Sequence, residues 1–433
     1  MKRFPFLSLL LFTAIPNCIA VPQAFSSSSQ DGDHPQVSLS VGSASGTLRR
    51  YSHPGTLQSV VDTALSHDLD IWQLSSSYVD VYLPPHQRLP EKLQNIPHDI
   101  SEIPLNPHLP AVSSKPGQWN LSTNDPANNT FHASYHSLYE IDLFIKELST
   151  SFPKRARVIK LGHSAEGREI TDDEKPGFVI SGAQHAREWV ATSTSLFLAH
   201  ALLTSHELLL EKYDFYIIPS PNPDGYTYTW EIDRFWYKNR QLMGAHAKCI
   251  GLDMGRNWGY KWKSRAIDGG DNFNLSSSRK GPTAPVDPCS HWYPGHRAFE
   301  SPEVNNVANF ITTLPNLQVF LDLRAYGQML SAPYSYSCDV YPRDAEDQME
   351  AATGAVMCLI QFSHIFLPLI GQSNRAPGNI VDWMYKKAGI KYSFAVHLRD
   401  TGTYGFSLPA QWIRPVGQET LQMVEYFAKF ATL

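Results

Sequence analysis

From residue 131 to the C-terminus, short apolar runs of strand composition alternate with segments of helical periodicity, and this alternation constrains the fold more than any other feature. The strand-like runs cover residues 158–161, 178–181, 215–218, 319–323 and 392–396, and helical patterns include 138–148, 189–204 and 418–433. Strands that alternate with helices build layered domains in which helices cover the sheet. We therefore expect an α/β domain with a mixed central sheet and helices on both faces.

Polar residues follow the ends of several of these runs. His185 and Glu188 come after residues 178–181, Arg324 follows 319–323, and His397 follows 392–396. Open α/β sheets place their binding sites at the carboxyl ends of their strands. A His and a Glu three positions apart suit two ligands of one zinc ion. The sequence thus predicts a site at this edge of the sheet, with His185 and Glu188 as candidate metal ligands.

Before residue 130 the sequence predicts a signal peptide, a leader, a small module and a linker. Residues 1–20 combine a basic start with an apolar run and a small final residue, which is the pattern of a secretory signal peptide. Within 21–129 we expect a disordered leader up to about residue 48, a small α/β module at 57–93 and a Pro-rich linker from 98. The large domain spans 130–433. No further stretch approaches the roughly 20 apolar residues of a membrane helix.

A signal peptide predicts secretion, with delivery to a vacuole left open, and it changes how the cysteines are read. Cys18 leaves with the signal peptide, and an even number of cysteines remains in an oxidising compartment. Pairing of sequence neighbours gives Cys249–Cys289 and Cys338–Cys358, and the two other connectivities stay open.

Charge and sequons add two weaker indications. The net charge of -5 and the pI near 6.4 disfavour a nucleic acid as partner, because phosphate binding requires a basic face. Asn120, Asn128 and Asn274 stand in acceptor sequons, which makes them candidate glycan sites of a secreted chain.

A series of short phrases, in a consistent order along the chain, resembles the zinc carboxypeptidase A/B family. The phrases are Leu-Gly-His-Ser-Ala-Glu-Gly-Arg at 161–168, Gly-Ala-Gln-His-Ala-Arg-Glu-Trp at 182–189, Asn-Pro-Asp-Gly-Tyr at 222–226, Asp-Met-Gly-Arg-Asn-Trp at 253–258 and Leu-Arg-Asp-Thr-Gly at 398–402. Leu-Asp-Ile-Trp at 69–72 resembles the pro-region of that family, here shortened. The departures from the pattern look most like a fungal branch of inactive, secreted members linked to cell-wall organisation.

The resemblance implies a zinc ion held by two His and one Glu, with an open position for water. His185 and Glu188 match two of these ligands, but the third position is Arg324, whose guanidinium cannot deprotonate and so cannot ligate a metal. The general-base position holds His397 in place of a Glu, and Tyr237 stands where an Arg would polarise the scissile carbonyl. The catalytic set implied by the family is therefore not intact.

The residues implied to bind the substrate match the family pattern more closely than the residues implied to perform catalysis. Arg256 matches a residue that grips the terminal carboxylate of the substrate, although its partner position is Gly255 instead of Asn. Arg187 matches an outer-subsite residue. Val381 matches a residue of the specificity pocket and would suit an apolar or aromatic side chain.

Three arrangements of the metal side follow from these residues. Glu188 could pair with the Arg324 guanidinium and exclude the metal. Alternatively, His397 could replace the missing ligand and restore a set of two His and one Glu, or His185 and Glu188 could hold zinc weakly on their own. Zinc is thus expected to be weakened or lost, unless the site has been rebuilt around His397.

The sequence predicts a secreted, inactive metallocarboxypeptidase-like protein that binds the C-terminal carboxylate of a peptide or protein and has a role in cell-wall organisation. It would act as a monomer, with cell-wall components as further candidate partners. Two alternatives remain open. One is an active zinc metallocarboxypeptidase with an altered site, which removes apolar C-terminal residues, and the other is a non-binding structural protein of the cell wall.

Overall fold

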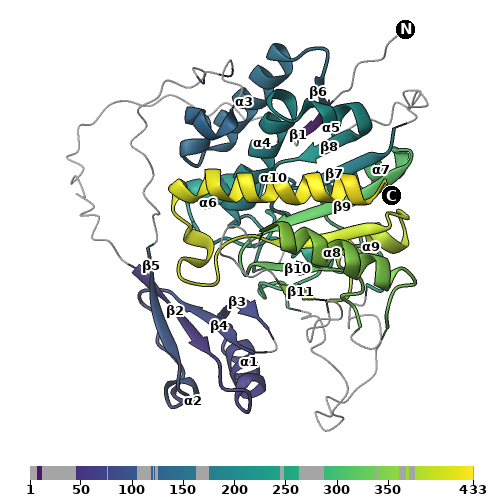
Figure 1. Ribbon diagram of the computed structural model, residues 1–433. Helices are drawn as coiled ribbons and strands as arrows, with labels where there is room; N and C mark the ends of the chain where they lie inside the picture. Colours follow the sequence, from purple (N-terminus) through teal and green to yellow (C-terminus); the bar gives the residue numbers. More distant parts are fainter. Residues whose placement is uncertain are drawn as a thin grey trace, which may run out of the picture.

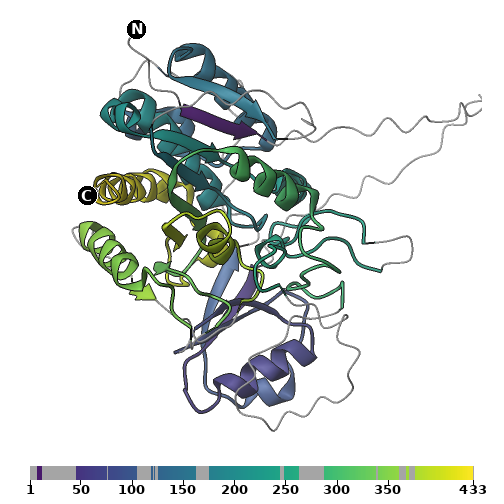
Figure 2. The same ribbon diagram turned by 90° about the vertical axis from the view of Figure 1, so that its right-hand side faces the viewer.

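The computed structural model describes residues 7–11, 45–75, 77–104, 119, 121, 125–161, 175–243, 248–262, 287–337, 340–359, 367–369 and 376–432. Two sheets organise these residues. An eight-stranded sheet forms the centre of the large domain, and a four-stranded sheet forms a separate lobe beside it (Figures 1 and 2).

The large sheet is mixed, as the sequence predicts. Its strands are β1 (Leu7–Leu11), β6 (Ala156–Lys160), β7 (Gly177–Ser181), β8 (Asp214–Ile218), β9 (Leu317–Arg324), β10 (Met329–Ser331), β11 (Leu367–Leu369) and β12 (Tyr392–His397). Their order is β11-β10-β12-β9-β7-β8-β1-β6. Neighbouring strands run parallel, except that β10 and β12 are antiparallel.

Helices cover both faces of this sheet, which confirms the predicted fold class (Figure 1). The helices of the large domain are α3 (Leu138–Ser151), α4 (Trp189–Thr204), α5 (Glu207–Lys212), α6 (Pro223–Glu231), α7 (Pro302–Thr313), α8 (Ala345–Leu359), α9 (Ile380–Lys386) and α10 (Ile413–Phe430). Short 3₁₀ helices lie at Pro126–Asn128, Thr130–Ala133, Met254–Arg256, Gly405–Ser407 and Ala410–Trp412. The predicted bounds of α4 agree with the structure at both ends.

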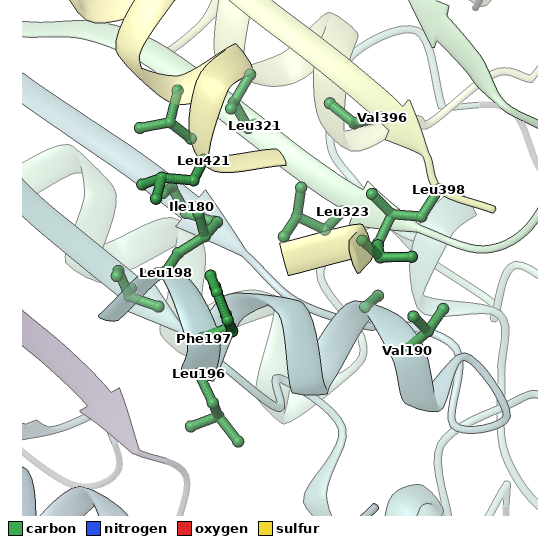
Figure 3. Close-up of a cluster of buried hydrophobic side chains, with 14 of the residues drawn as sticks. Ile180, Val190, Leu196, Phe197, Leu198, Leu321, Leu323, Val396, Leu398 and Leu421 are labelled. Atoms are coloured by element: carbon green, nitrogen blue, oxygen red, sulfur yellow. The ribbon is translucent and has the colours of Figure 1, made fainter. Parts of the chain in front are cut away.

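Alternating strand residues supply two hydrophobic cores, one on each face of the sheet. In β9, Leu321 and Leu323 pack with α4 and α10, whereas Phe320 packs on the other face with α7 and α9. Figure 3 shows the first of these cores, where Ile180 and Leu321 of the strands meet Leu198 of α4 and Leu421 of α10. Successive residues of a strand point to opposite faces, so a strand buried on both sides is apolar throughout.

The smaller lobe is an α/β module built from residues 45–104. It consists of β2 (Ser45–Tyr51), α1 (Leu57–Ser66), β3 (Asp70–Leu74), β4 (Val79–Leu83), α2 (Glu91–Gln94) and β5 (Asp99–Pro104). The strand order is β3-β4-β2-β5, and all pairs are antiparallel. The module has its own core, in which Val60 and Ala64 of α1 meet Val79 and Val81 of β4.

Two predicted boundaries of this module are wrong. Residues 45–48 belong to β2 and not to a leader, and residues 99–104 form β5 and not a linker. Both strands carry small, polar or charged residues, so local composition hides them. Their pairing is set by the rest of the sheet, because strand formation depends on packing context more than on intrinsic preference.

Strand β1 falls inside the segment predicted to be a signal peptide. The structure pairs Leu7–Leu11 in parallel with both β6 and β8. A short apolar run fits a parallel strand as well as the apolar region of a leader, and periodicity cannot separate the two. Removal of this segment as a signal peptide stays a prediction, which the N-terminal sequence of the purified protein tests.

The cysteines and the acceptor sequons can now be compared with the structure. The predicted Cys249–Cys289 disulfide is formed, whereas Cys338 and the side chain of Cys358 lie outside the described residues. Asn128 is exposed in a 3₁₀ helix, and the sequons at Asn120 and Asn274 lie outside the described residues.

Among the helices that the structure describes, none has the length and apolar character needed to cross a membrane.

Candidate functional site

The loop between β7 and α4 carries His185 and Glu188, and buried polar contacts fix its path. The amide nitrogen of Asn222, the N-cap of α6, donates to the carbonyls of Gln184 and Lys238 at 3.0 and 3.1 Å. The side chain of Gln184 donates to Asp322 on β9 at 2.9 Å and accepts from Trp258 at 3.1 Å. The loop is thus tied to its neighbouring strand before any site residue is considered.

The predicted site residues gather at the carboxyl ends of the strands, as expected. Glu188 is the N-cap residue of α4, but its side chain does not cap the helix. Arg324 ends β9 and His397 ends β12, and these two residues are directly paired in the parallel register. The structure therefore confirms that these distant positions in the sequence lie at one edge of the sheet.

His185 is held between two carboxylates. Its Nδ1 lies 3.1 Å from Oε1 of Glu188, and its Nε2 lies 3.1 Å from Oδ1 of Asp253. The ring also stacks on Tyr237, with centroids 3.9 Å apart. Both nitrogen atoms that could ligate a metal are therefore engaged inside the protein.

Arg324 forms its ion pair with Asp322 and not with Glu188. Its Nε donates to Oδ2 of Asp322 at 2.5 Å, and that carboxylate is fully buried. Residues two apart on a strand share a face, so the Asp322 carboxylate is the nearest partner that the chain offers. Burial alone would lower the pKa of Arg324, but the Asp322 and Glu188 carboxylates hold it above its ordinary value.

The predicted ion pair between Glu188 and Arg324 is therefore wrong for the structure as described. Glu188 bonds His185 in its place, while Nη2 of Arg324 and Oε2 of Glu188 are each buried without a hydrogen-bond partner among the described residues. The two groups still interact electrostatically, because Glu188 contributes to the raised pKa of Arg324.

His397 is an uncharged residue at the predicted base position. Its Nδ1 lies 3.2 Å from the carbonyl oxygen of Tyr326, which can only accept, so Nδ1 carries the proton. Burial, followed by the nearby Arg324 cation, lowers the pKa of His397 to about 4. The ring is therefore neutral near pH 7 and offers no negative charge to a metal or a water molecule.

The residues present do not fit a zinc site. Within the described ranges, no group of three or more His, Cys, Asp or Glu side chains is arranged to hold a metal ion. His185 and Glu188 are bonded to each other, the third position carries the Arg324 guanidinium, and His397 bonds a backbone carbonyl. The rebuilt site around His397 is thus not formed in this structure.

Arg256 lies on the more open side of the site. Its Nη1 forms an ion pair with Asp253, a carboxylate that is fully buried, and its guanidinium lies 5.1 Å from the ring centroid of Trp292. Burial would raise the pKa of Asp253, but Arg256 and His185 hold it well below its ordinary value. The Arg256 side chain remains 24% exposed, whereas that of Arg324 is 10% exposed.

Tyr237 and Gly255 complete this side. Burial raises the pKa of Tyr237, so its phenol stays protonated and can act only as an uncharged donor or acceptor. A Cβ atom at Gly255 would lie 2.8 Å from Nε2 of His185 and 3.3 Å from Nη2 of Arg324. The absence of a side chain at 255 thus leaves room for the ring and the guanidinium beside the backbone.

The module covers Arg187, the predicted outer-subsite residue. Arg187 is 1% exposed, and its Nη1 donates to Oδ2 of Asp70 on β3 at 2.6 Å. Its guanidinium also lies 4.3 Å from the ring centroid of Phe406. A ligand at this position would have to displace Asp70, so in the full chain Arg187 serves module docking.

An aromatic contact fixes the module beside that ion pair. Trp72 is buried in the core of the large domain, with ring centroids 4.9 Å from Phe406 and 5.0 Å from Phe235. Gly405 has φ +57°, and a Cβ there would come within 2.7 Å of the Trp72 ring. Glycine therefore permits both the turn and the close approach of the module.

A second ion pair reinforces the docking. Arg50 donates to both oxygens of Asp80 at 2.7 and 2.6 Å, and Tyr326 of the large domain donates to Oδ2 of the same carboxylate at 2.7 Å. Asp80 is fully buried. The hydroxyl of Tyr326 thus joins the large domain to a charged pair that lies within the module.

Val381 packs in the hydrophobic core on the α7 and α9 face and is 1% exposed. The next residue, Asp382, accepts backbone N–H bonds from Ser335 and Tyr336 at 2.7 and 2.9 Å. Val381 therefore supports this strand-end region from inside the core, and its predicted place in a specificity pocket stays a prediction.

Three acidic residues that shape the site were missed by sequence reasoning: Asp70, Asp253 and Asp322. Two of them carried a local signal. Asp322 stands two positions before Arg324 in a strand, and Asp253 stands three positions before Arg256. No local sequence signal indicated the pairing of Asp70, because its partner Arg187 is far away in the sequence.

Comparison with known proteins agrees with this architecture. The family described as zinc carboxypeptidase matches residues 141–423. The inactive metallocarboxypeptidase ECM14 of Ajellomyces dermatitidis is 32% identical over 418 residues, which cover 84% of this chain and 67% of the relative.

Two solved structures are similar as well. Thrombin-activatable fibrinolysis inhibitor matches with a TM-score of 0.70 and 26% identity, over 89% of this chain and 98% of its own. The bovine form, in complex with tick carboxypeptidase inhibitor, matches with a TM-score of 0.60 and 32% identity, over 70% of this chain and 99% of its own. The fold, the strand-end site and these matches together show that the chain belongs to the zinc carboxypeptidase family.

Proposed function

We propose that this protein is a catalytically inactive member of its family that acts by binding the C-terminal carboxylate of a peptide or protein. The observation that carries the proposal is the contrast between two arginines: the side chain of Arg324, at the metal-ligand position, is 10% exposed, whereas that of Arg256, at the carboxylate-binding position, is 24% exposed. The name of the relative from Ajellomyces dermatitidis, an inactive metallocarboxypeptidase, supports the loss of activity.

Hydrolysis would need three functions that the described residues do not supply. A Lewis acid would have to sit where the Arg324 guanidinium is, and a carboxylate base would have to stand at the neutral His397. Tyr237 would have to stabilise the developing oxyanion without a charge. Loss of one such donor alone costs about 3 kcal/mol of transition-state stabilisation, and units that act together fail together.

Binding of a carboxylate requires fewer functional groups than hydrolysis does. A guanidinium has five N–H donors, and Arg256 uses Nη1 for Asp253, which orients the group and leaves donors for a ligand. A carboxylate ligand would form charge-assisted hydrogen bonds there without any metal. Binding of a protein partner is consistent with the related bovine structure, which contains a carboxypeptidase inhibitor.

The expected location is extracellular, with a role in cell-wall organisation. The support is the apolar N-terminal run with its basic start, together with the Cys249–Cys289 disulfide, which is typical of an oxidising compartment. The resemblance to fungal cell-wall-linked members supports the wall association, and fractionation of the producing cells tests both.

Paired ligands test the binding proposal. Peptides with a free C-terminal carboxylate and the same peptides amidated are titrated against the full-length protein by calorimetry. We expect the free acid to bind at least about tenfold more tightly, and Arg256→Gln to remove that difference. Arg297→Gln is the matched control, because Arg297 is exposed on the neighbouring loop. Equal affinity for acid and amide would overturn the proposal and favour the purely structural role.

A peptide panel tests inactivity. The full-length protein is incubated with peptides that end in apolar, aromatic, basic or acidic residues, with zinc and with a chelator, and released amino acids are measured. We expect no release above the uncatalysed rate in either condition. Release that disappears in the chelator would establish an active metallocarboxypeptidase and defeat the proposal.

A further inference from the structure

We propose that the Arg324 guanidinium is the resident cation of this site, that it takes the place of the metal ion of the family, and that it makes the fold independent of zinc. This inference goes beyond the proposed function. It requires no ligand at Arg256, so either one can fail while the other stands.

The first support is the arrangement of buried charge. Asp253, Asp322 and Glu188 are 0%, 0% and 3% exposed, so an ionised carboxylate at each position needs a nearby cation. Arg256 supplies it for Asp253, and Arg324 supplies it for Asp322. Removal of Arg324 would leave Asp322 without its only ion-pair partner among the described residues.

The second support is that one atom of Arg324 and one atom of Glu188 are buried without a hydrogen bond to any residue that the structure describes. Nη2 of Arg324 and Oε2 of Glu188 are both buried and both lack a hydrogen-bond partner among the described residues. Glu188 is the candidate metal ligand, and its carboxylate interacts electrostatically with the Arg324 guanidinium. A divalent ion on Glu188 would place two positive centres next to each other in a site that excludes water, where repulsion is poorly screened.

The third support is the space for the guanidinium. Two departures from the family pattern, Gly255 and Arg324, meet in the structure, because a Cβ at 255 would lie 3.3 Å from Nη2 of Arg324. That separation is tighter than ordinary van der Waals contact, and a larger side chain would crowd the guanidinium further. The small residue at 255 and the large cation at 324 therefore form one coordinated change.

The experiment is a zinc titration of full-length protein that has been treated with a chelator and desalted. Calorimetry gives stoichiometry and affinity, and thermal melts with zinc or chelator give a readout that needs no activity. We expect the wild type to show no 1:1 binding, and its Tm to be unchanged by zinc or by chelator. Arg324→His supplies the imidazole that the family pattern requires at this position.

Arg324→His should bind one zinc ion. Its gain in zinc affinity should exceed the roughly 10–100-fold change typical of mutating a residue that only orients a metal ligand, and zinc should raise its Tm. The gain should disappear in Arg324→His combined with His185→Asn. Arg399→His is the matched control, because Arg399 is another buried arginine, and its carboxylate partner Glu419 lies in α10. That control should gain no zinc binding.

Three results would overturn the proposal. One is tight 1:1 zinc binding by the wild type that His185→Asn removes. Another is an Arg324→His protein that is folded by circular dichroism but binds zinc no better than the wild type. The third is an equal gain in Arg399→His. If Arg324→His does not fold, Arg324→Lys keeps the cation and carries the test: it should exclude zinc, and zinc binding by it would contradict the proposal.

Discussion

The two sides of the site differ in how their arginines are enclosed. On the metal side, Arg324 is paired to a carboxylate of its own strand and its side chain is 10% exposed. On the carboxylate side, Arg256 is also paired to a buried aspartate, but its side chain is 24% exposed. Both guanidiniums are fixed by internal acids, and they differ in how much of the side chain reaches solvent. Under the proposed function, this difference separates the lost hydrolytic chemistry from a retained carboxylate contact at the same strand edge.

The largest expected effect is a difference in the free energy of unfolding between the variants Arg324→Met and Arg256→Met. Loss of Arg324 removes the ion-pair partner of the buried Asp322 and leaves it the Gln184 bond, which should lower the free energy of unfolding by about 3–5 kcal/mol at pH 7. Arg256→Met should cost less, about 1–3 kcal/mol, because Asp253 keeps its bonds from His185 and the Gly255 amide. Urea unfolding measures both, and a reversed order would break the comparison.

The disulfide should contribute to the stability of the protein and to peptide binding at Arg256. Cys249–Cys289 spans 40 residues, and it anchors the segment whose Trp292 lies against Arg256. Replacement of both cysteines by serine should cost about 3–4 kcal/mol on a loop-entropy estimate and weaken binding of free-acid peptides. Zinc exclusion should be unchanged, because Arg324 is held by Asp322. A variant that gained zinc binding would show that the two sides are not independent.

Acid should destabilise the protein in part through a pair of buried histidines in its core. His132 and His200 are buried and joined by a 3.0 Å hydrogen bond, and burial lowers the pKa of His200 to about 4. Between pH 6.5 and 4 the unfolded chain binds more protons at this residue than the folded chain, so stability falls as the pH falls, by about 3 kcal/mol for His200. The double change His132→Leu and His200→Leu should flatten this slope.

Urea unfolding at pH 7.0 and 5.0 measures that slope in the wild type and in the double variant. An unchanged pH dependence in the variant would assign the acid sensitivity elsewhere, including to the site. His67→Leu is the control, because this histidine is exposed at the end of α1.

The smallest effect is expected at the module. Asp70→Asn keeps the shape of the side chain but removes the charge that pairs with Arg187. The cost should be about 1–3 kcal/mol, and free-acid peptides should bind a few-fold more tightly as the module loosens. Asp62→Asn is a matched control on the exposed face of α1. Weaker peptide binding in Asp70→Asn would show that the module builds the ligand site.

Most of the large domain could be predicted from sequence because its strands are apolar on both faces. The pattern placed β7, β8, β9 and β12 within one or two residues, and it placed α4 between Trp189 and Thr204. It failed at β2 and β5, whose polar residues gain their strand pairing from neighbours. Leu7–Leu11 lies in a strand here, although the same apolar run has the character of a leader.

The site was predictable in its members but not in its pairings. Family resemblance brought His185, Glu188, Arg324 and His397 together, and the structure agrees. The choice of Asp322 over Glu188 as the partner of Arg324 could not be predicted, since it depends on how the side chains are oriented in the folded chain. The docking of Asp70 on Arg187 could not be predicted either, because it joins two separately folded lobes.

The most direct test is an experimental structure of the full-length protein crystallised with zinc, with anomalous diffraction recorded at the zinc edge. We predict no anomalous peak near His185 and Glu188, and an Arg324 guanidinium paired with Asp322. A peak at that position with tetrahedral coordination, and with Arg324 turned away, would contradict the account.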